Sequence, residues 1–320
     1  MGWAGADAAT MTGMTSSTYP AFQPLTGLHE PSAILQLPDG RFLVVEDEQE
    51  HSFNLLTLHP DGTASSESVG PGWFQGGGAI WNMEDLEGLS IDSLGFLYAV
   101  TSHSRDDEGD KKKPREKLAR FRIEGDRVVE PVVVSGLKQA LVEAHPVLAA
   151  AALVLQAKSG NGFNIEALEI TPDRQRLLIG FRSPLQGGHA LIASVENPTA
   201  IFEADASPQV SSRLQTLDLG GQGIRGLSYV SSLNGYLVVG GPTAREGTAF
   251  TLWFWSGKPE APARRVTIAG LPDIARAEGV SQALVDGKTC IVIVSDDGNR
   301  KQGKFASFLL LDAAQLQIAP

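Results

Sequence analysis

The eight residues DLEGLSID, Asp85 to Asp92, join a Glu-Gly pair to an apolar run that alternates in the manner of a β-strand. Related stretches recur along the chain, and they read NIEALEIT (164–171), GIRGLSYV (223–230) and AEGVSQAL (277–284). Alternation with a period of two is typical of a strand with one buried face. The recurrence therefore predicts a protein built from repeated β units.

Each recurring stretch begins a predicted hairpin, because turn residues separate it from a second apolar strand. Examples of these turn residues are Gly40, Asn234 and Asp286. Third and fourth strands follow in several repeats, as in KLARFRIEG (117–125) and RVVEPVVVSG (127–136). Four antiparallel strands per repeat are the blade of a β-propeller. We expect an all-β, five-bladed propeller, with six blades, a β-sandwich or two stacked domains as alternatives.

The two ends of the chain predict how the ring closes. The last repeat runs out after three strands, so the N-terminal FQPLTGL (22–28) is expected to supply the outer strand, where Pro24 suits an edge. Residues 1–18 are expected to be a flexible leader, and residues 19–320 a single propeller domain. Segment 136–158 is rich in helix formers around Pro146 and predicts two short inserted helices.

Charge limits the classes of partner. With 26 Lys and Arg against 37 Asp and Glu, the net charge of -11 disfavours nucleic acid and anionic membranes. We expect a small anionic molecule bound at a local basic site, or a basic partner protein. The N-terminus lacks the basic and apolar regions of a signal peptide. The sequence as given predicts a soluble cytoplasmic protein, or a periplasmic or secreted one if a signal peptide was removed.

Short motifs carry a resemblance to known families. Glu87-Gly88 and Glu278-Gly279 begin two of the recurring stretches, Glu166-Ala167 is a weaker copy, and Ser295-Asp296 ends a second strand. In these pairs the chain resembles bacterial propellers related to the esterase-like phytase and gluconolactonase families. The resemblance covers nearly the whole chain as a repeat pattern, and it implies the propeller fold more strongly than any activity.

Blade geometry predicts where the charged residues gather. An inner strand begins, and the second strand ends, on the same face beside the central channel, because adjacent antiparallel strands reverse direction. A hard cation such as Ca²⁺ takes six to eight oxygen ligands. The carboxylates expected to hold a divalent cation, with Ca²⁺ preferred, are Glu46, Glu87, Glu166, Glu278 and Asp296.

The same face supplies candidates for catalysis and for ligand binding. His103 ends a second strand and is the acid/base candidate, beside Glu87 and Asp296. The ligand-binding candidates are Arg105, Arg182, Arg225 and Trp81. Trp81 belongs to the glycine-rich segment 70–88, in which Trp73 and Phe74 are also expected to wall a pocket, unless the segment is only a connecting loop.

Carboxylates for a metal interleaved with arginines for an anion favour a metal-dependent hydrolase of a small anionic ester, phosphoester or lactone. The alternative function is a non-catalytic propeller that binds a protein or carbohydrate on the same face. A structural alternative also stays open, in which the charges pair with one another and hold the blades together.

Overall fold

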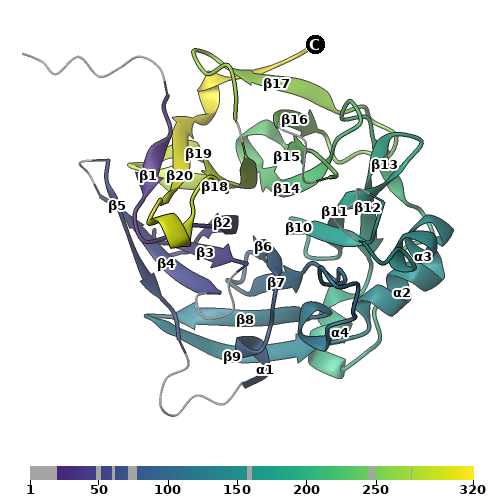
Figure 1. Cartoon of the computed structure of the whole chain (residues 1–320). Helices are drawn as coiled ribbons and strands as arrows, with labels where there is room; N and C mark the ends of the chain where they lie inside the picture. The colour runs from purple at the N-terminus through teal and green to yellow at the C-terminus, as the bar shows by residue number, and fades with distance from the viewer. Residues whose placement is uncertain are drawn as a thin grey trace, which may run out of the picture.

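The computed structural model describes residues 20–47, 52–59, 62–70, 78–156, 161–244, 249–274 and 276–320. Within these residues, five antiparallel sheets stand around a common centre (Figure 1). The fold is a five-bladed β-propeller, which confirms the predicted fold class and excludes the six-bladed alternative. The predicted leader, Trp73 and Phe74 lie outside the described residues.

The first three blades each contain four strands in chain order. Blade one consists of β2 (Pro31–Gln36), β3 (Phe42–Glu46), β4 (Phe53–Leu58) and β5 (Ala64–Ser68). Blade two consists of β6 (Leu86–Ile91), β7 (Leu97–Thr101), β8 (Leu118–Glu124) and β9 (Arg127–Val134). Blade three consists of β10 (Asn164–Ile170), β11 (Leu177–Gln186), β12 (His189–Val195) and β13 (Gln215–Leu217).

The last two blades draw on both ends of the chain. Blade four consists of β14 (Gly223–Val230), β15 (Gly235–Gly241), β16 (Thr251–Trp255), β17 (Arg264–Ile268) and β21 (Leu316–Ile318). Blade five consists of β18 (Ala277–Val285), β19 (Lys288–Ser295), β20 (Ala306–Asp312) and β1 (Gln23–Leu25). The N-terminal strand β1 thus closes the ring as predicted, with Pro24 opposite Ser307 at the sheet edge.

The inner strands surround the channel. In ring order they are β2, β6, β10, β14 and β18, and each contacts the two on either side of it, including β18 against β2. All five blades therefore present their first strand to one shared centre. Residues at equivalent positions of these strands must converge there.

The hairpin turns follow the local chemistry that the sequence indicates. Gly40, Asn234 and Asp286 adopt left-handed φ angles of 89°, 48° and 50°. Glycine, asparagine and aspartate accept this conformation better than other residues. These turns reverse the chain between first and second strands in blades one, four and five.

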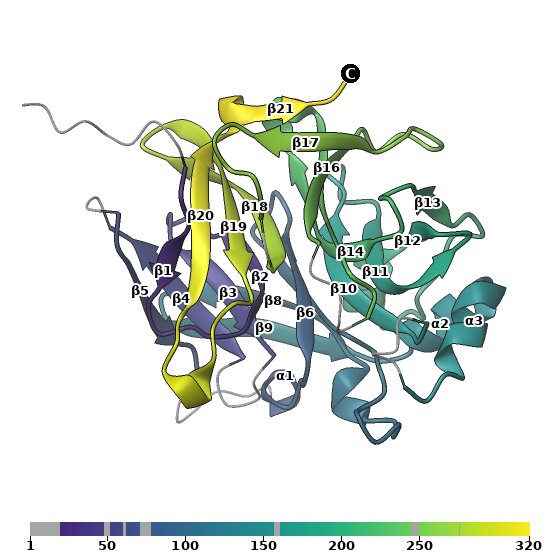
Figure 2. The same cartoon turned by 45° about the horizontal axis from the view of Figure 1, so that its top comes forward.

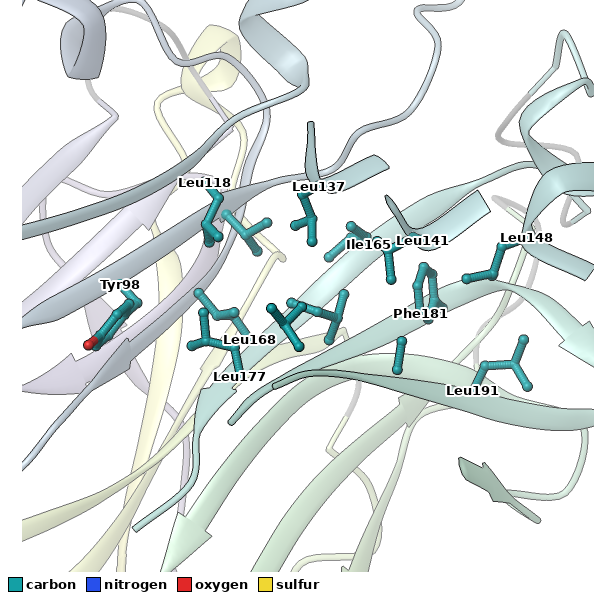
Figure 3. Close-up of a cluster of buried hydrophobic side chains, with 14 of the residues drawn as sticks. Tyr98, Leu118, Leu137, Leu141, Leu148, Ile165, Leu168, Leu177, Phe181 and Leu191 are labelled. Atoms are coloured by element: carbon teal, nitrogen blue, oxygen red, sulfur yellow. The ribbon is translucent and has the colours of Figure 1, made fainter. Parts of the chain in front are cut away.

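Two helices, α2 (Leu137–Ala144) and α3 (Pro146–Ala152), lie between blades two and three in the sequence. Figure 3 shows Leu137, Leu141 and Leu148 packed with Ile165 and Phe181 in the core between these blades. Fully burying one leucine stabilises a fold by about 1.5–3 kcal/mol. The helices therefore anchor to the outside of the ring, beside the blades in Figures 1 and 2.

The remaining helices are short. They are α1 (Gly78–Trp81), before blade two, and α4 (Pro198–Ala204), within blade three. No helix among the described residues is long and apolar enough to cross a membrane.

Candidate functional site

Each inner strand carries a register shift near its beginning. The pairing with the second strand skips Ser32, Glu87, Glu166 and Arg225 in blades one to four, and the pair Glu278-Gly279 in blade five. A β-bulge re-aims the side chain of the extra residue and is common beside functional sites. We call these five side chains, Ser32, Glu87, Glu166, Arg225 and Glu278, the charged ring.

The charged ring converges at one mouth of the channel. Ser32, Glu87, Glu166 and Arg225 line the same small cavity of about 10 Å³, together with Gly279 beside Glu278. This volume holds about one water molecule. The inner strands thus bring Glu87 and Glu166 to one cavity, and Arg225 links Glu278 to them.

Glu166 is the centre of an ion-pair network. Its Oε1 accepts hydrogen bonds from Arg182 Nη1 at 3.0 Å and from Asn164 Nδ2 at 2.9 Å. Its Oε2 accepts from Arg225 Nη1 at 2.6 Å, and the same nitrogen lies 3.2 Å from Glu278 Oε1. All these residues are buried. The network joins blades three, four and five. These charges therefore pair with one another and hold the blades together, which is the structural alternative that the sequence leaves open.

The two arginines are themselves held in place. Arg182 Nε donates to the carbonyl oxygens of Pro242 and Thr243, at 3.2 and 3.1 Å. Burial alone favours a neutral Arg225, but the charges of Glu166 and Glu278 outweigh it and raise the pKa of Arg225 above its ordinary value. Arg225 Nε is buried and has no hydrogen-bond partner among the described residues. One donor of Arg225 is thus left open.

Glu87 differs from Glu166 because no cation lies against it. It is half-buried, and its carboxyl group has no hydrogen bond or ion pair with the residues that the structure describes. Burial, together with the negative charges of Glu166 and Asp85, raises the pKa of Glu87 well above the ordinary range. The carboxyl group of Glu87 can therefore either keep a proton or bind a cation.

Two further carboxyl groups near the ring have raised pKa values. Burial raises the pKa of Glu278 to about 8, although Arg225 opposes the shift. Burial and the charge of Glu30 raise the pKa of Asp296, whose carboxyl group has no ion pair with the described residues. A carboxyl group with a pKa near 8, such as that of Glu278, can supply a proton near neutral pH.

Glu46 occupies a separate cluster between blades one and five. Its Oε1 accepts hydrogen bonds from the backbone N–H groups of His29 and Glu30, at 2.6 and 3.0 Å. Its Oε2 lies 3.3 Å from Asn54 Nδ2 and 3.4 Å from Arg300 Nη2. Both oxygens are therefore engaged away from the other predicted metal ligands.

A similar cluster, which the sequence analysis missed, surrounds Asp85 in blade two. The buried Asp85 carboxylate accepts hydrogen bonds from the hydroxyl groups of Ser102 and Ser104 and pairs with Arg115 Nη1 at 3.2 Å. Asp85 directly precedes the strand of Glu87, and its positive φ of 62° turns the chain there. The available signal was an aspartate two residues before the pair Glu87-Gly88, where the chain enters the strand.

His103 lies inside the protein, without exposed surface. Its ring Nδ1 donates to the Thr101 carbonyl oxygen at 2.8 Å, and Lys138 Nζ of α2 donates to the carbonyl oxygen of His103 at 2.7 Å. Burial lowers the pKa of His103 to about 4, so its ring is neutral at pH 7. The ring is thus enclosed, whereas the sequence predicted a position on the rim of the channel.

The remaining candidates lie outside the charged ring. Arg105 donates to the carbonyl oxygens of Gly109 and Ala152, and so binds the helical segment to the loop after β7. Trp81 of α1 packs edge-on against Phe53, with ring centres 6.0 Å apart. Of the four predicted ligand-binding residues, the structure brings Arg182 and Arg225 together with the carboxylates.

Within the described residues, no three His, Cys, Asp or Glu side chains are arranged as a group that can hold a metal ion. Ion pairs with arginines occupy Glu166 and Glu278, and backbone N–H groups occupy Glu46. The predicted Ca²⁺ site stays a prediction.

The sequence profile of one protein family matches residues 136–301, and this family is described as "Protein of unknown function (DUF3616)". No curated protein sequence matches the chain. Several solved structures resemble it at low sequence identity.

Three of these structures illustrate the range. A putative oxidoreductase (glucose dehydrogenase) from Thermus thermophilus is 16% identical over 91% of this chain and 100% of its own, with a TM-score of 0.47. The PQQ-bound aldose sugar dehydrogenase of Streptomyces coelicolor is 13% identical over 94% and 99%, with a TM-score of 0.42. The allergen Mala s 1 of Malassezia sympodialis is 15% identical over 90% and 80%, with a TM-score of 0.44. Similarity this distant assigns no activity to the chain.

Proposed function

The chain belongs to the DUF3616 family, and we propose that its charged ring is the active site of a metal-dependent hydrolase for a small anionic ester, phosphoester or lactone. The observation that carries the proposal is the state of Glu87 and Asp296. Neither carboxyl group is paired with a cation among the described residues, and burial raises the pKa of both. Unpaired groups with perturbed pKa values gather at functional sites.

A divalent cation, with Ca²⁺ preferred, fits the chemistry of these two groups. Repulsion from Glu166 and Asp85 contributes to the raised pKa of Glu87, and a bound cation relieves such repulsion. Glu87 would be the protein ligand in the charged ring, with water completing the shell. A bound metal ion polarises the electrophilic oxygen of an ester and lowers the pKa of a bound water.

The arginines supply the second half of the proposed site. Glu166 and Glu278 hold Arg225 in a fixed position, while its Nε has no partner among the described residues. The positive charge of such a fixed guanidinium attracts a phosphate or carboxylate that binds on the rim. In this role Glu166 and Glu278 position Arg225 and do not bind the metal.

Titration of Ca²⁺ and Mn²⁺ into the wild type and Glu87→Gln by calorimetry tests the proposal. Hydrolysis of p-nitrophenyl phosphate and gluconolactone would be followed with and without each ion. We expect the wild type to bind one cation and to need it for hydrolysis. Glu87→Gln should bind it at least tenfold more weakly, whereas Glu124→Gln, on an exposed part of β8, should match the wild type. Failure of both ions to bind the wild type would refute the metal-dependent mechanism.

One observation favours the non-catalytic alternative. The cavity beside the charged ring measures about 10 Å³, so a substrate cannot be enclosed there and has to bind on the outer rim. A broad rim suits a protein or carbohydrate ligand. A lysine-rich peptide and a set of oligosaccharides would therefore be tested in parallel. Salt-sensitive peptide binding that Glu87→Gln weakens, without any hydrolysis, would support this alternative.

A further inference from the structure

A second cavity lies at the opposite mouth of the channel. The far halves of the inner strands line a space of about 380 Å³, which we call the distal cavity and define by Ser90, Glu169, Ser228, Tyr229 and Ser281. Small-molecule sites are typically about 300–1,000 Å³. The distal cavity is therefore large enough for a small ligand, in contrast to the space beside the charged ring.

The distal cavity repeats the ring arrangement three residues further along the strands. Ser90, Glu169, Ser228 and Ser281 each follow a member of the charged ring by three positions, and blade one has Leu35 there. Three residues of extended strand span about 10 Å. The second ring thus contains three hydroxyl groups, one apolar residue and a single carboxyl group.

Glu169 is this carboxyl group, and it is only 9% exposed. Its Oε2 accepts a hydrogen bond from Ser90 Oγ and its Oε1 accepts one from Tyr229 N, both at 3.0 Å. No ion pair joins Glu169 to any residue that the structure describes. A carboxylate has about four acceptor positions. Two of them are left for a ligand.

The groups around Glu169 suit a positively charged ligand. Ser228 is 8% exposed, and its hydroxyl group has no hydrogen-bond partner among the described residues, so it can accept from an N–H donor. Tyr229 lines the cavity, and its ring packs edge-on against Tyr236, with ring centres 5.3 Å apart. The face of an aromatic ring attracts cations.

The neighbouring titratable groups do not neutralise Glu169. Asp92, directly after β6, pairs with Arg174 Nε at 3.0 Å, so this arginine already has a counter-ion. Burial raises the pKa of Tyr236 on β15, so its hydroxyl group is uncharged near neutral pH. Burial likewise raises the pKa of Glu169 to about 8. A cation that binds below pH 8 must therefore displace a proton from Glu169.

We propose that the distal cavity binds a small organic cation with N–H donors, of the alkylammonium or guanidinium class, and that Glu169 is its counter-ion. Buried charges in proteins are paired, and a cation in the distal cavity would provide the partner that Glu169 lacks. The serine hydroxyls and the Tyr229 ring would complete the contacts. This proposal is independent of any activity at the charged ring.

Methylguanidinium and N-methylurea form a matched pair of probes, because they are similar in size and shape and differ in charge. Guanidinium groups keep their charge over the whole pH range needed. Each probe would be titrated by calorimetry into the wild type, Glu169→Gln and the exposed control Glu124→Gln, at pH 9 and pH 6. Glu169→Gln keeps the shape of the side chain; its single oxygen can still accept from Tyr229 N, while its NH2 group can donate to Ser90 Oγ.

We expect the wild type at pH 9 to bind methylguanidinium at least tenfold more tightly than N-methylurea. That preference should fall at least tenfold at pH 6, where Glu169 is protonated, and it should be absent in Glu169→Gln but intact in Glu124→Gln. Equal binding of both probes to the wild type, no binding of either, or an unchanged preference in Glu169→Gln would overturn the proposal.

A second measurement keeps the test decisive if Glu169→Gln does not fold. The titration of the Glu169 carboxyl carbon would be followed by NMR in the wild type, with and without methylguanidinium. Binding to the ionised form should move the midpoint to lower pH. An unmoved midpoint at saturating probe would contradict the assignment of Glu169 as the counter-ion.

Discussion

Glu166 and Glu169 lie three residues apart on β10, at opposite mouths of the same channel, and both are buried. Glu166 accepts hydrogen bonds from Arg182 and Arg225, whereas Glu169 accepts only from a hydroxyl and a backbone N–H. Burial removes water from both carboxylates. Only at Glu166 do opposite charges compensate for this loss. The two mouths of the channel therefore differ. At one mouth, which we call the ionic mouth, arginines pair with Glu166; at the other, Glu169 has no ion pair with the described residues.

The largest effect is expected from breaking the ionic mouth at Arg225. Arg225→Met removes the cation that contacts Glu166 and Glu278, so that Glu278 loses its ion pair and Glu166 keeps only that with Arg182. Removal of one partner of a buried ion pair costs about 3–5 kcal/mol. Urea unfolding should show a loss of this size at pH 7.

Arg213→Met is the matched control, since Arg213 pairs with Glu260 where both side chains are more than half exposed. Exposed pairs contribute at most about 1 kcal/mol. If the two variants lose similar stability, Arg225 does not hold the ionic mouth together.

A smaller effect should come from the region between the two mouths. A Cβ atom at Gly226 would overlap the backbone carbonyl oxygen of Glu278 on the neighbouring inner strand. Overpacking of this kind costs about 1–3 kcal/mol. Gly226→Ala should lower the free energy of unfolding by that amount, whereas Gly70→Ala, where the space is open, should stay near the wild type. A tolerant Gly226 would mean that the inner strands are not in close contact there.

The third prediction concerns pH. The folded-state pKa values of Glu169 and Glu278, about 8, lie above the ordinary 4.5, so the folded state holds their protons more tightly. The stability that this contributes is complete below about pH 4.5 and is lost as the pH rises through 8. His103 has the opposite sign, since its lowered pKa contributes stability above pH 6.5 that is lost as the pH falls through about 4.

Between pH 6.5 and 8 only the carboxyl effect remains, so the free energy of unfolding should decline with rising pH. The slope is at most about 1.4 kcal/mol per pH unit for each carboxyl group. Urea unfolding at several pH values should show a smaller slope in Glu169→Gln and an unchanged slope in Glu124→Gln. A wild-type slope of zero in this window would contradict the unpaired state of Glu169.

Much of the fold is predictable because its signals are local. The hairpins depend on turn residues such as Asn234 and on strand alternation, and both are visible in short windows of sequence. Strand β21, which extends blade four, and helix α4 were not predicted. A three-residue edge strand pairs with a segment some fifty residues earlier, so no local pattern reveals it. For α4 a local signal existed, since Asn197 is its N-cap and Pro198 its first residue.

The sites were only partly predictable for a different reason. The position of Glu87, Glu166 and Glu278 followed from the repeat, but which carboxylate meets an arginine depends on side-chain geometry across blades. Glu169 escaped prediction because strict alternation places it on the opposite face from Glu166. The bulge at Glu166 changes this phase and lets both side chains contribute to the channel.

The most direct test of the difference between the two mouths compares Glu166→Gln with Glu169→Gln by urea unfolding at pH 7. Each change removes one carboxyl group from β10 and keeps its shape. Glu166→Gln should lose about 3 kcal/mol, because Arg182 and Arg225 lose their shared counter-ion. Glu169→Gln should stay within about 1 kcal/mol of the wild type, because a protonated acid is replaced by a neutral amide. Equal losses in the two variants, or a larger loss in Glu169→Gln, would contradict the account.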